Sequence, residues 1–142
     1  MGLFSFVRDA GKKLFGKDED PAEAIAKEVA DLGLEGDVEV KVEGDKVVIA
    51  GSAPTQELRE KIILAAGNVD GIASVEDNIQ PEDTSAAADF HTVEKGDTLW
   101  AVSKKAYGDG SKYMKIFEAN KPMLSDPDKI YPGQVLRIPA EG

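Results

Sequence analysis

The chain has 142 residues, 42% of them hydrophobic, which is enough for one ordinary domain or two small ones and excludes a disordered chain. The absence of cysteine excludes disulfide bonds and thiol catalysis, and the single histidine, His91, excludes a histidine-based metal cluster. The formal net charge of −10 is concentrated in residues 18–80, whose sixteen acidic and five basic side chains argue against binding a nucleic-acid backbone.

Residues 1–17 form an apolar segment with a few basic residues. The spacing of its apolar residues predicts a short amphipathic helix, or two with a break at Gly11: Leu3, Phe4, Phe6, Val7, Ala10, Leu14 and Phe15. Its partner is either a membrane surface or the protein itself, and the small number of basic residues favours the protein. Neither a signal sequence nor a run of about 20 apolar residues is present. We therefore expect a cytoplasmic protein with no membrane span.

Two elements are marked clearly in residues 18–51. Asp20 precedes a Pro at the first turn and a Glu three residues further on, which predicts a helix over 20–33. Valines alternate with charged residues over 38–43, and a second β-branched run follows the Gly44-Asp45 turn. This pattern predicts a β-hairpin with one half-buried face.

A second helix and a third strand follow. Leu58, Ile62 and Ala65 share one face of a predicted helix from Pro54 to Ala66, and Gly67-Asn68 ends it. Residues 72–80 then read as a strand, which gives residues 18–80 an αββαβ order. The polar and small-residue stretch over 81–90 is predicted to be a linker between two domains.

Residues 91–142 predict a βααβ unit. Thr92-Val93 begins a strand, and Asp97-Thr98 can cap a helix that starts at Leu99. A second helix covers 113–120, and the turn at 131–134 leads into a returning strand over 135–138. Trp100 lies on the first of these helices, where we expect it to be partly buried in the core.

The residues GDTL, YG, EAN and PGQVLRIP occur in this order, and with them residues 91–142 resemble the LysM domain. The stretch GSAPT at 51–55 and the turn from Val69 to Val75 make residues 18–80 similar to the BON domain. The resemblance implies an α+β protein: an N-terminal helical segment packed on a BON domain, a linker, and a LysM domain.

The whole chain resembles the bacterial potassium-binding proteins of the BON-LysM family, through MGLF and FVRDAGKKLF at the start and IFEANKPML near the end. The resemblance implies a cytoplasmic protein that binds K⁺ and changes conformation on binding, as a sensor or buffer. It implies no enzyme activity, and the sequence has no GxSxG elbow or Walker-type loop. The expected partner is the potassium ion alone, and we expect a monomer.

Potassium is matched best by several neutral carbonyl oxygens, whereas clustered carboxylates favour harder divalent ions. Helices that end at Gly11 and Gly67 would each leave carbonyl groups without intrahelical partners and would carry partial negative charge there. We hypothesise that backbone carbonyls of two segments converge on one K⁺: Val7, Ala10 and Lys12 with Gly67, Val69 and Ile72. The competing interpretation is that Gly11 and Gly67 are ordinary helix caps.

An alternative function belongs to a different class. LysM domains generally bind N-acetylglucosamine chains such as peptidoglycan, in a groove between two loops. The corresponding residues in this sequence are Gly96, Asp97, Thr98 and Leu99 in one loop, and Met123, Leu124 and Ile130 in the other. A cytoplasmic protein does not meet peptidoglycan, so this alternative requires export.

Overall fold

The computed structural model describes residues 2–6, 20–34, 36–69, 71–83, 88–121 and 123–139, and its elements fall into two modules. The N-terminal module contains β1 (Gly2–Ser5), α1 (Pro21–Asp31), β2 (Asp37–Glu43), β3 (Lys46–Thr55), α2 (Gln56–Gly67) and β4 (Ser74–Asp83). The C-terminal module contains β5 (Asp89–Thr92), α3 (Leu99–Tyr107), the 3-10 turn η1 (Gly110–Lys112), α4 (Tyr113–Ala119) and β6 (Val135–Ile138). The α+β prediction is confirmed.

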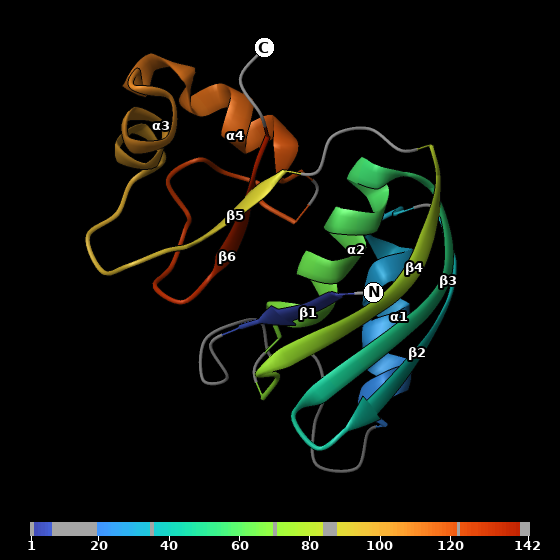
Figure 1. Ribbon diagram of the computed structural model, residues 1–142. Helices are drawn as coiled ribbons and strands as arrows, with labels where there is room; N and C mark the ends of the chain where they lie inside the picture. Colours follow the sequence, from blue (N-terminus) through green and yellow to red (C-terminus); the bar gives the residue numbers. More distant parts are fainter. Residues whose placement is uncertain are drawn as a thin grey trace.

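The N-terminal module is a four-stranded sheet with the order β1-β4-β3-β2. β3 and β4 are parallel and are connected by α2, while β1 and β2 run antiparallel to their neighbours. Figure 1 shows α1 and α2 against one face of this sheet, with α2 between the sheet and the β5–β6 pair. α2 therefore belongs to the N-terminal core and also forms the surface on which the C-terminal module lies.

The two long helices begin where their capping residues predict or close to it. The Asp20 carboxylate accepts the Ala22 N–H at 3.0 Å, which confirms the predicted start of α1. The Thr55 hydroxyl accepts the Leu58 N–H at 3.0 Å, so α2 starts at Gln56, and the predicted start at Pro54 was two residues early. β3 continues through Pro54 to Thr55. Pro54 lies between Ala53 and Thr55, which pair with Pro81 and Asp83 of β4, and it has no N–H to donate to the ladder.

The predicted N-terminal helix was wrong for residues 2–5, which form strand β1 on the edge of the sheet. Leu3 is 65% exposed, while Phe4 is half-buried and Phe6 is 9% exposed. This alternation has the period of a strand, with both phenylalanines on the core side. β4, the strand that pairs with β1, lies about seventy residues away in the sequence, so the local sequence pattern does not predict this pairing. Residues 7–17, the rest of that prediction, lie outside the described part of the chain.

The C-terminal module is an antiparallel β5–β6 pair with two helices, as the βααβ prediction expected. All four residues of β6 are buried, and they alternate in what they contact. Leu136 and Ile138 belong to the core of their own module, with Val93, Leu99, Val102, Ile116, Phe117 and Leu124. Val135 instead joins the core of the N-terminal module. β6 is thus a strand whose two faces are each covered by a different module.

Strand structure covers both ends of the predicted linker, because β4 extends to Asp83 and β5 begins at Asp89. In the part of the chain that the model describes, no helix has the length and apolar character needed to cross a bilayer.

Candidate functional site

The turn that follows α2 is the described part of the hypothesised cation site. α2 ends at Gly67, and the Asn68 N–H donates to the Leu64 carbonyl at 2.9 Å. The Ile72 N–H donates to the Val69 carbonyl at 3.1 Å, and Gly71 between them has a φ of 98°, which favours glycine. The turn therefore brings the predicted residues Gly67, Val69 and Ile72 together.

The environment of this turn suits a cation held by backbone atoms. Val69 and Ile72 are each 1% exposed. Among described residues outside helices and strands, no backbone N–H donates to the carbonyl of Gly67 or of Ile72. The helix dipole adds partial negative charge at this end of α2. A carbonyl oxygen that accepts no N–H beside these buried residues would suit an ion of low charge density.

The other half of the predicted ligand set, Val7, Ala10 and Lys12, lies outside the described residues, as does Gly11. Phe6 is the last described residue before them. Its N–H donates to the Ala73 carbonyl at 2.8 Å, one residue beyond Ile72. Phe6, the residue that precedes the predicted N-terminal ligands in the sequence, thus lies beside the α2 turn.

Gly67 is the last residue of α2, and Asn68 is its C-cap, so the helix ends where Gly67-Asn68 predicted it. The φ of Gly67 is not positive, so it continues the helical geometry and needs no special conformation. The reason for glycine here is space, because a methyl group on its Cα would overlap the Phe6 ring. The predicted end of α2 is confirmed, and the structure adds the packing reason for glycine at this position.

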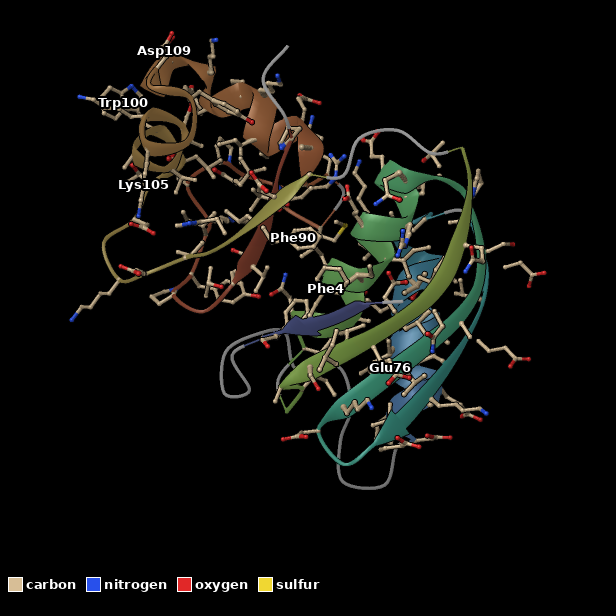
Figure 2. The ribbon with its side chains drawn as sticks, in the orientation of Figure 1. Phe4, Glu76, Phe90, Trp100, Lys105 and Asp109 are labelled. Carbon is tan, nitrogen blue, oxygen red and sulfur yellow. The ribbon has the colours of Figure 1, made fainter. Side chains whose placement is uncertain are left out.

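Acidic side chains do not form an alternative cage within the described ranges, where no group of three or more His, Asp or Glu residues could hold a metal ion. The carboxylates with perturbed pKa values are scattered. The Lys46 ammonium lowers the pKa of Glu76, the Glu94 N–H and His91 lower that of Asp97, and the Ser111 side chain and N–H lower that of Asp109. Figure 2 shows Glu76 and Asp109 in different modules.

Asn68, beside the predicted ligands Gly67 and Val69, connects the two modules. Its side-chain amide donates to the Val135 carbonyl at 2.8 Å and accepts the Val135 N–H at 2.9 Å. Asn120, from α4's end, bonds both backbone groups of Arg137 in the same way, at 2.9 and 2.8 Å. The edge of β6 is therefore satisfied by two asparagine side chains, one from each module.

A network of polar side chains on α2 also connects the N-terminal module to the C-terminal module. The Arg137 guanidinium donates to Glu60 at 2.7 Å, and both side chains are nearly buried. Glu60 also accepts from Gln56 at 3.1 Å and from the Ala88 N–H at 2.9 Å. Gln56 accepts from Arg59 at 3.1 Å, and Arg59 forms an ion pair with the fully buried Asp77 on β4. The network joins the N-terminal sheet to β6.

Sequence reasoning missed Asn68, Glu60 and Arg137 as interface residues. Their partners lie 67 and 77 positions away in the chain, so no local spacing pointed to them. The one available signal was the polarity of Glu60 at a position four residues from Gln56 on an otherwise apolar helix face.

Two further contacts complete the boundary between the modules. The Phe4 and Phe90 rings meet edge to face, with centroids 5.0 Å apart, and Figure 2 shows them where β1 approaches β5. A cleft of about 300 Å³ also lies at the boundary, and both modules line it: Glu28, Leu32, Leu64, Ala65, Asn68, Met123, Tyr131 and Gln134. Burial raises the pKa of the Tyr131 phenol.

The residues of the carbohydrate alternative are divided among different places. Thr98 caps α3 by accepting the Ala101 N–H at 3.1 Å, and Asp97 accepts the Glu94 N–H at 2.9 Å beside Gly96. Leu99 and Leu124 are buried core residues, and Ile130 packs against that core. Met123 instead lines the cleft between the modules.

A second cleft, of about 310 Å³, lies beside Thr98 and Leu99, with Trp100, Tyr113, Pro127 and Asp128 as its other lining residues. Trp100 is 51% exposed, so the prediction that it is partly buried core was wrong. Its indole lies over the backbone of Gly110, where a side chain would collide with the ring, and Lys104 lies over the indole at 5.2 Å. Figure 2 shows Trp100 at the end of its module remote from the N-terminal module.

Family comparisons agree with this two-module architecture. The BON domain matches residues 17–82, and the LysM domain matches residues 91–139. The potassium binding protein Kbp of Escherichia coli O6:H1 is 47% identical over 149 aligned residues, which cover 99% of this chain and 100% of that relative. An uncharacterised Deinococcus radiodurans protein is 32% identical over 114 residues, covering 72% of this chain and 44% of its own length. The uncharacterised protein YqbP of Bacillus subtilis is 40% identical over 65 residues, or 39% of this chain and 30% of its own length. The chain belongs to the bacterial family of BON-LysM proteins that includes Kbp.

Proposed function

We propose that this protein binds potassium ions in the cytoplasm, as a sensor or buffer and not as an enzyme. The observation that carries the proposal is the 47% identity, over essentially the full length of both chains, to a protein named for potassium binding. The proposed ligands are backbone carbonyls of Val7, Ala10, Lys12, Gly67, Val69 and Ile72.

The geometry of the α2 turn supports this choice of ligands. A cation placed there would lie at the negative end of the α2 dipole, beside the buried residues Val69 and Ile72. Neutral oxygens suit K⁺ better than Mg²⁺ or Ca²⁺, which are bound mainly through carboxylates. The ion acts as a bridge between the segment that follows β1 and the turn that follows α2.

The proposed conformational response follows from the position of Asn68. Its backbone lies between two proposed ligands, and its side chain holds Val135 of the LysM domain. An ion that fixes the turn therefore favours the orientation of Asn68 that holds β6. This is a population shift, which requires that the docked arrangement bind K⁺ more tightly than the undocked one.

The test is titration calorimetry of the full-length protein in a buffer free of alkali metal ions. We expect saturable heat with KCl and none with NaCl at equal ionic strength. Absence of a saturable K⁺ signal in a folded sample would refute the proposed function. Fractionation of the native host's cells tests the location, with recovery outside the cytoplasm as the contrary result.

The cleft beside Trp100 favours one second candidate function, which is binding of an N-acetylglucosamine chain by the LysM domain. An exposed indole fixed over Gly110 offers a flat surface on which a sugar ring can stack. Chitin oligomers titrated into the same sample test this candidate. Saturable oligosaccharide binding without K⁺ binding would replace the first proposal with the second.

A further inference from the structure

The contact between Phe6 and Gly67 joins the two segments that are proposed to share the ion. β1 pairs with β4 in the register Phe4↔Val75 and Ser5↔Ser74, and the Phe6 N–H extends the pairing by donating to the Ala73 carbonyl at 2.8 Å. The backbone of Phe6 is therefore fixed beside the end of the α2 turn.

The side chain of Phe6 also holds this residue beside the end of α2. Its ring is 9% exposed and belongs to the N-terminal core, where it lies directly over the backbone of Gly67. A methyl group at Gly67 would overlap the far atoms of the ring, and Gly67 has no positive φ that would otherwise require glycine. Glycine at 67 and phenylalanine at 6 are thus matched to each other by shape.

We propose that Phe6 is a positioning residue for potassium binding, which acts by holding the start of the N-terminal segment against Gly67. This inference rests on the proposed function. The proposed N-terminal ligands begin at the next residue of the chain after Phe6, so a docked Phe6 fixes the point beside the turn from which that segment starts. Undocking of the ring removes this fixed starting point and should therefore weaken K⁺ binding.

The neighbouring residues Leu3 and Phe4 of β1 make different contacts from Phe6, so their variants can serve as controls for Phe6 variants. Leu3 is 65% exposed on the opposite face of the strand. Phe4 contacts Phe90 of the LysM domain and so belongs to the boundary between the domains. Of these three side chains, Phe6 is the one whose ring lies over Gly67.

The first experiment measures K⁺ affinity of the full-length protein by calorimetry, together with its fold by circular dichroism. Because the loss of a buried aromatic ring undocks the strand end, we expect Phe6→Ala to weaken K⁺ binding by about tenfold or more. We expect Leu3→Ala to change the affinity by less than about twofold, since its side chain is exposed. Equal affinities of wild type and a folded Phe6→Ala would overturn the inference.

The second experiment uses the shape match and decides the matter even if Phe6→Ala fails to fold. Gly67→Ala should weaken K⁺ binding by about tenfold, because its methyl group displaces the ring. Adding Phe6→Leu to Gly67→Ala should recover most of that loss, since leucine lacks the ring atoms that the methyl group meets. No recovery would contradict the inference.

A purely structural role would lower the unfolding midpoint of these variants without changing their K⁺ affinity. If the wild type binds no K⁺, the proposed function itself fails, which is a distinguishable result.

Discussion

At the scale of single residues, Asn68 carries a connection that a side chain of another type would not reproduce. Its amide matches the N–H and the C=O of Val135 at the same time, at 2.9 and 2.8 Å. Val135 is 4% exposed, so water does not readily replace a lost partner. An aspartate of the same size has no N–H to donate to the Val135 carbonyl.

We therefore expect Asn68→Ala to lower the free energy of unfolding by about 2 to 4 kcal/mol, since it leaves two buried backbone groups without partners. The measurement is urea denaturation followed by circular dichroism. Asn78→Ala is the control, because the Asn78 side-chain N–H donates to the Glu76 side chain at 3.2 Å and its Oδ1 accepts no hydrogen bond within the described residues, so its removal leaves no backbone group without a partner. Similar losses in the two variants would show that the Asn68 contact is not the cause.

At the scale of elements, α2 and β6 are held together by a buried ion pair within a polar network. Glu60 is 3% exposed and accepts from Arg137, Gln56 and the Ala88 N–H. A buried ion pair contributes little net stability compared with apolar residues of similar size, but removal of one partner leaves an uncompensated charge. The pair therefore acts mainly to specify how β6 lies on α2.

Arg137→Met should destabilise the protein by about 3 to 5 kcal/mol, because it leaves the Glu60 carboxylate buried without its cation. Adding Glu60→Gln should restore part of this loss, since the neutral amide oxygen still accepts the Ala88 N–H. Lys121→Met serves as the control, as Lys121 pairs with Glu118 on the surface at 3.2 Å. Chemical denaturation of the wild type and the three variants measures these losses of stability. An equal loss in Arg137→Met and in the double variant would exclude an uncompensated charge as the cause.

The elements differ in how well the sequence predicted them, for physical reasons. The β2–β3 hairpin and α1 were predictable because alternation, turn residues and the Asp20 cap are local signals. The sequence predicts a helix where β1 lies because the apolar residues over 2–16 fit more than one spacing, and the pairing of β1 with β4 decides for a strand over 2–5. The sequence predicts a core position for Trp100 because it does not show that the backbone of Gly110 packs against the indole ring. Of the predicted ion ligands, Gly67, Val69 and Ile72 are described, and their role in binding stays a prediction.

At the scale of the whole molecule, the two domains share contacts that are buried and directional. Val135 lies in the core of the BON domain, Asn68 and Glu60 bond to β6, and Phe4 packs on Phe90. Because Asn68 belongs to the α2 turn and bonds β6, we expect a change at that turn to affect how the LysM domain lies on α2. The structure thus predicts thermodynamic coupling between ion binding and the LysM domain.

Trp100 makes this coupling measurable, because it is the only tryptophan of the chain and lies in the LysM domain, at the end remote from the BON domain (Figure 2). Its indole packs on Gly110, so unfolding of that domain changes its fluorescence. An ion that binds only the folded state at 100 times its Kd adds about 2.7 kcal/mol of stability. If the domains unfold together, we expect Trp100 fluorescence and circular dichroism to report this same gain in the free energy of unfolding in KCl, and none in NaCl of equal ionic strength.

In the double variant Asn68→Ala/Arg137→Met, the gain in stability measured by circular dichroism should persist, and the gain measured by Trp100 fluorescence should shrink, because LysM no longer holds the α2 turn. A gain at Trp100 that survives in this variant would mean that the coupling runs through other contacts, of which Phe4 and Phe90 are the next to test.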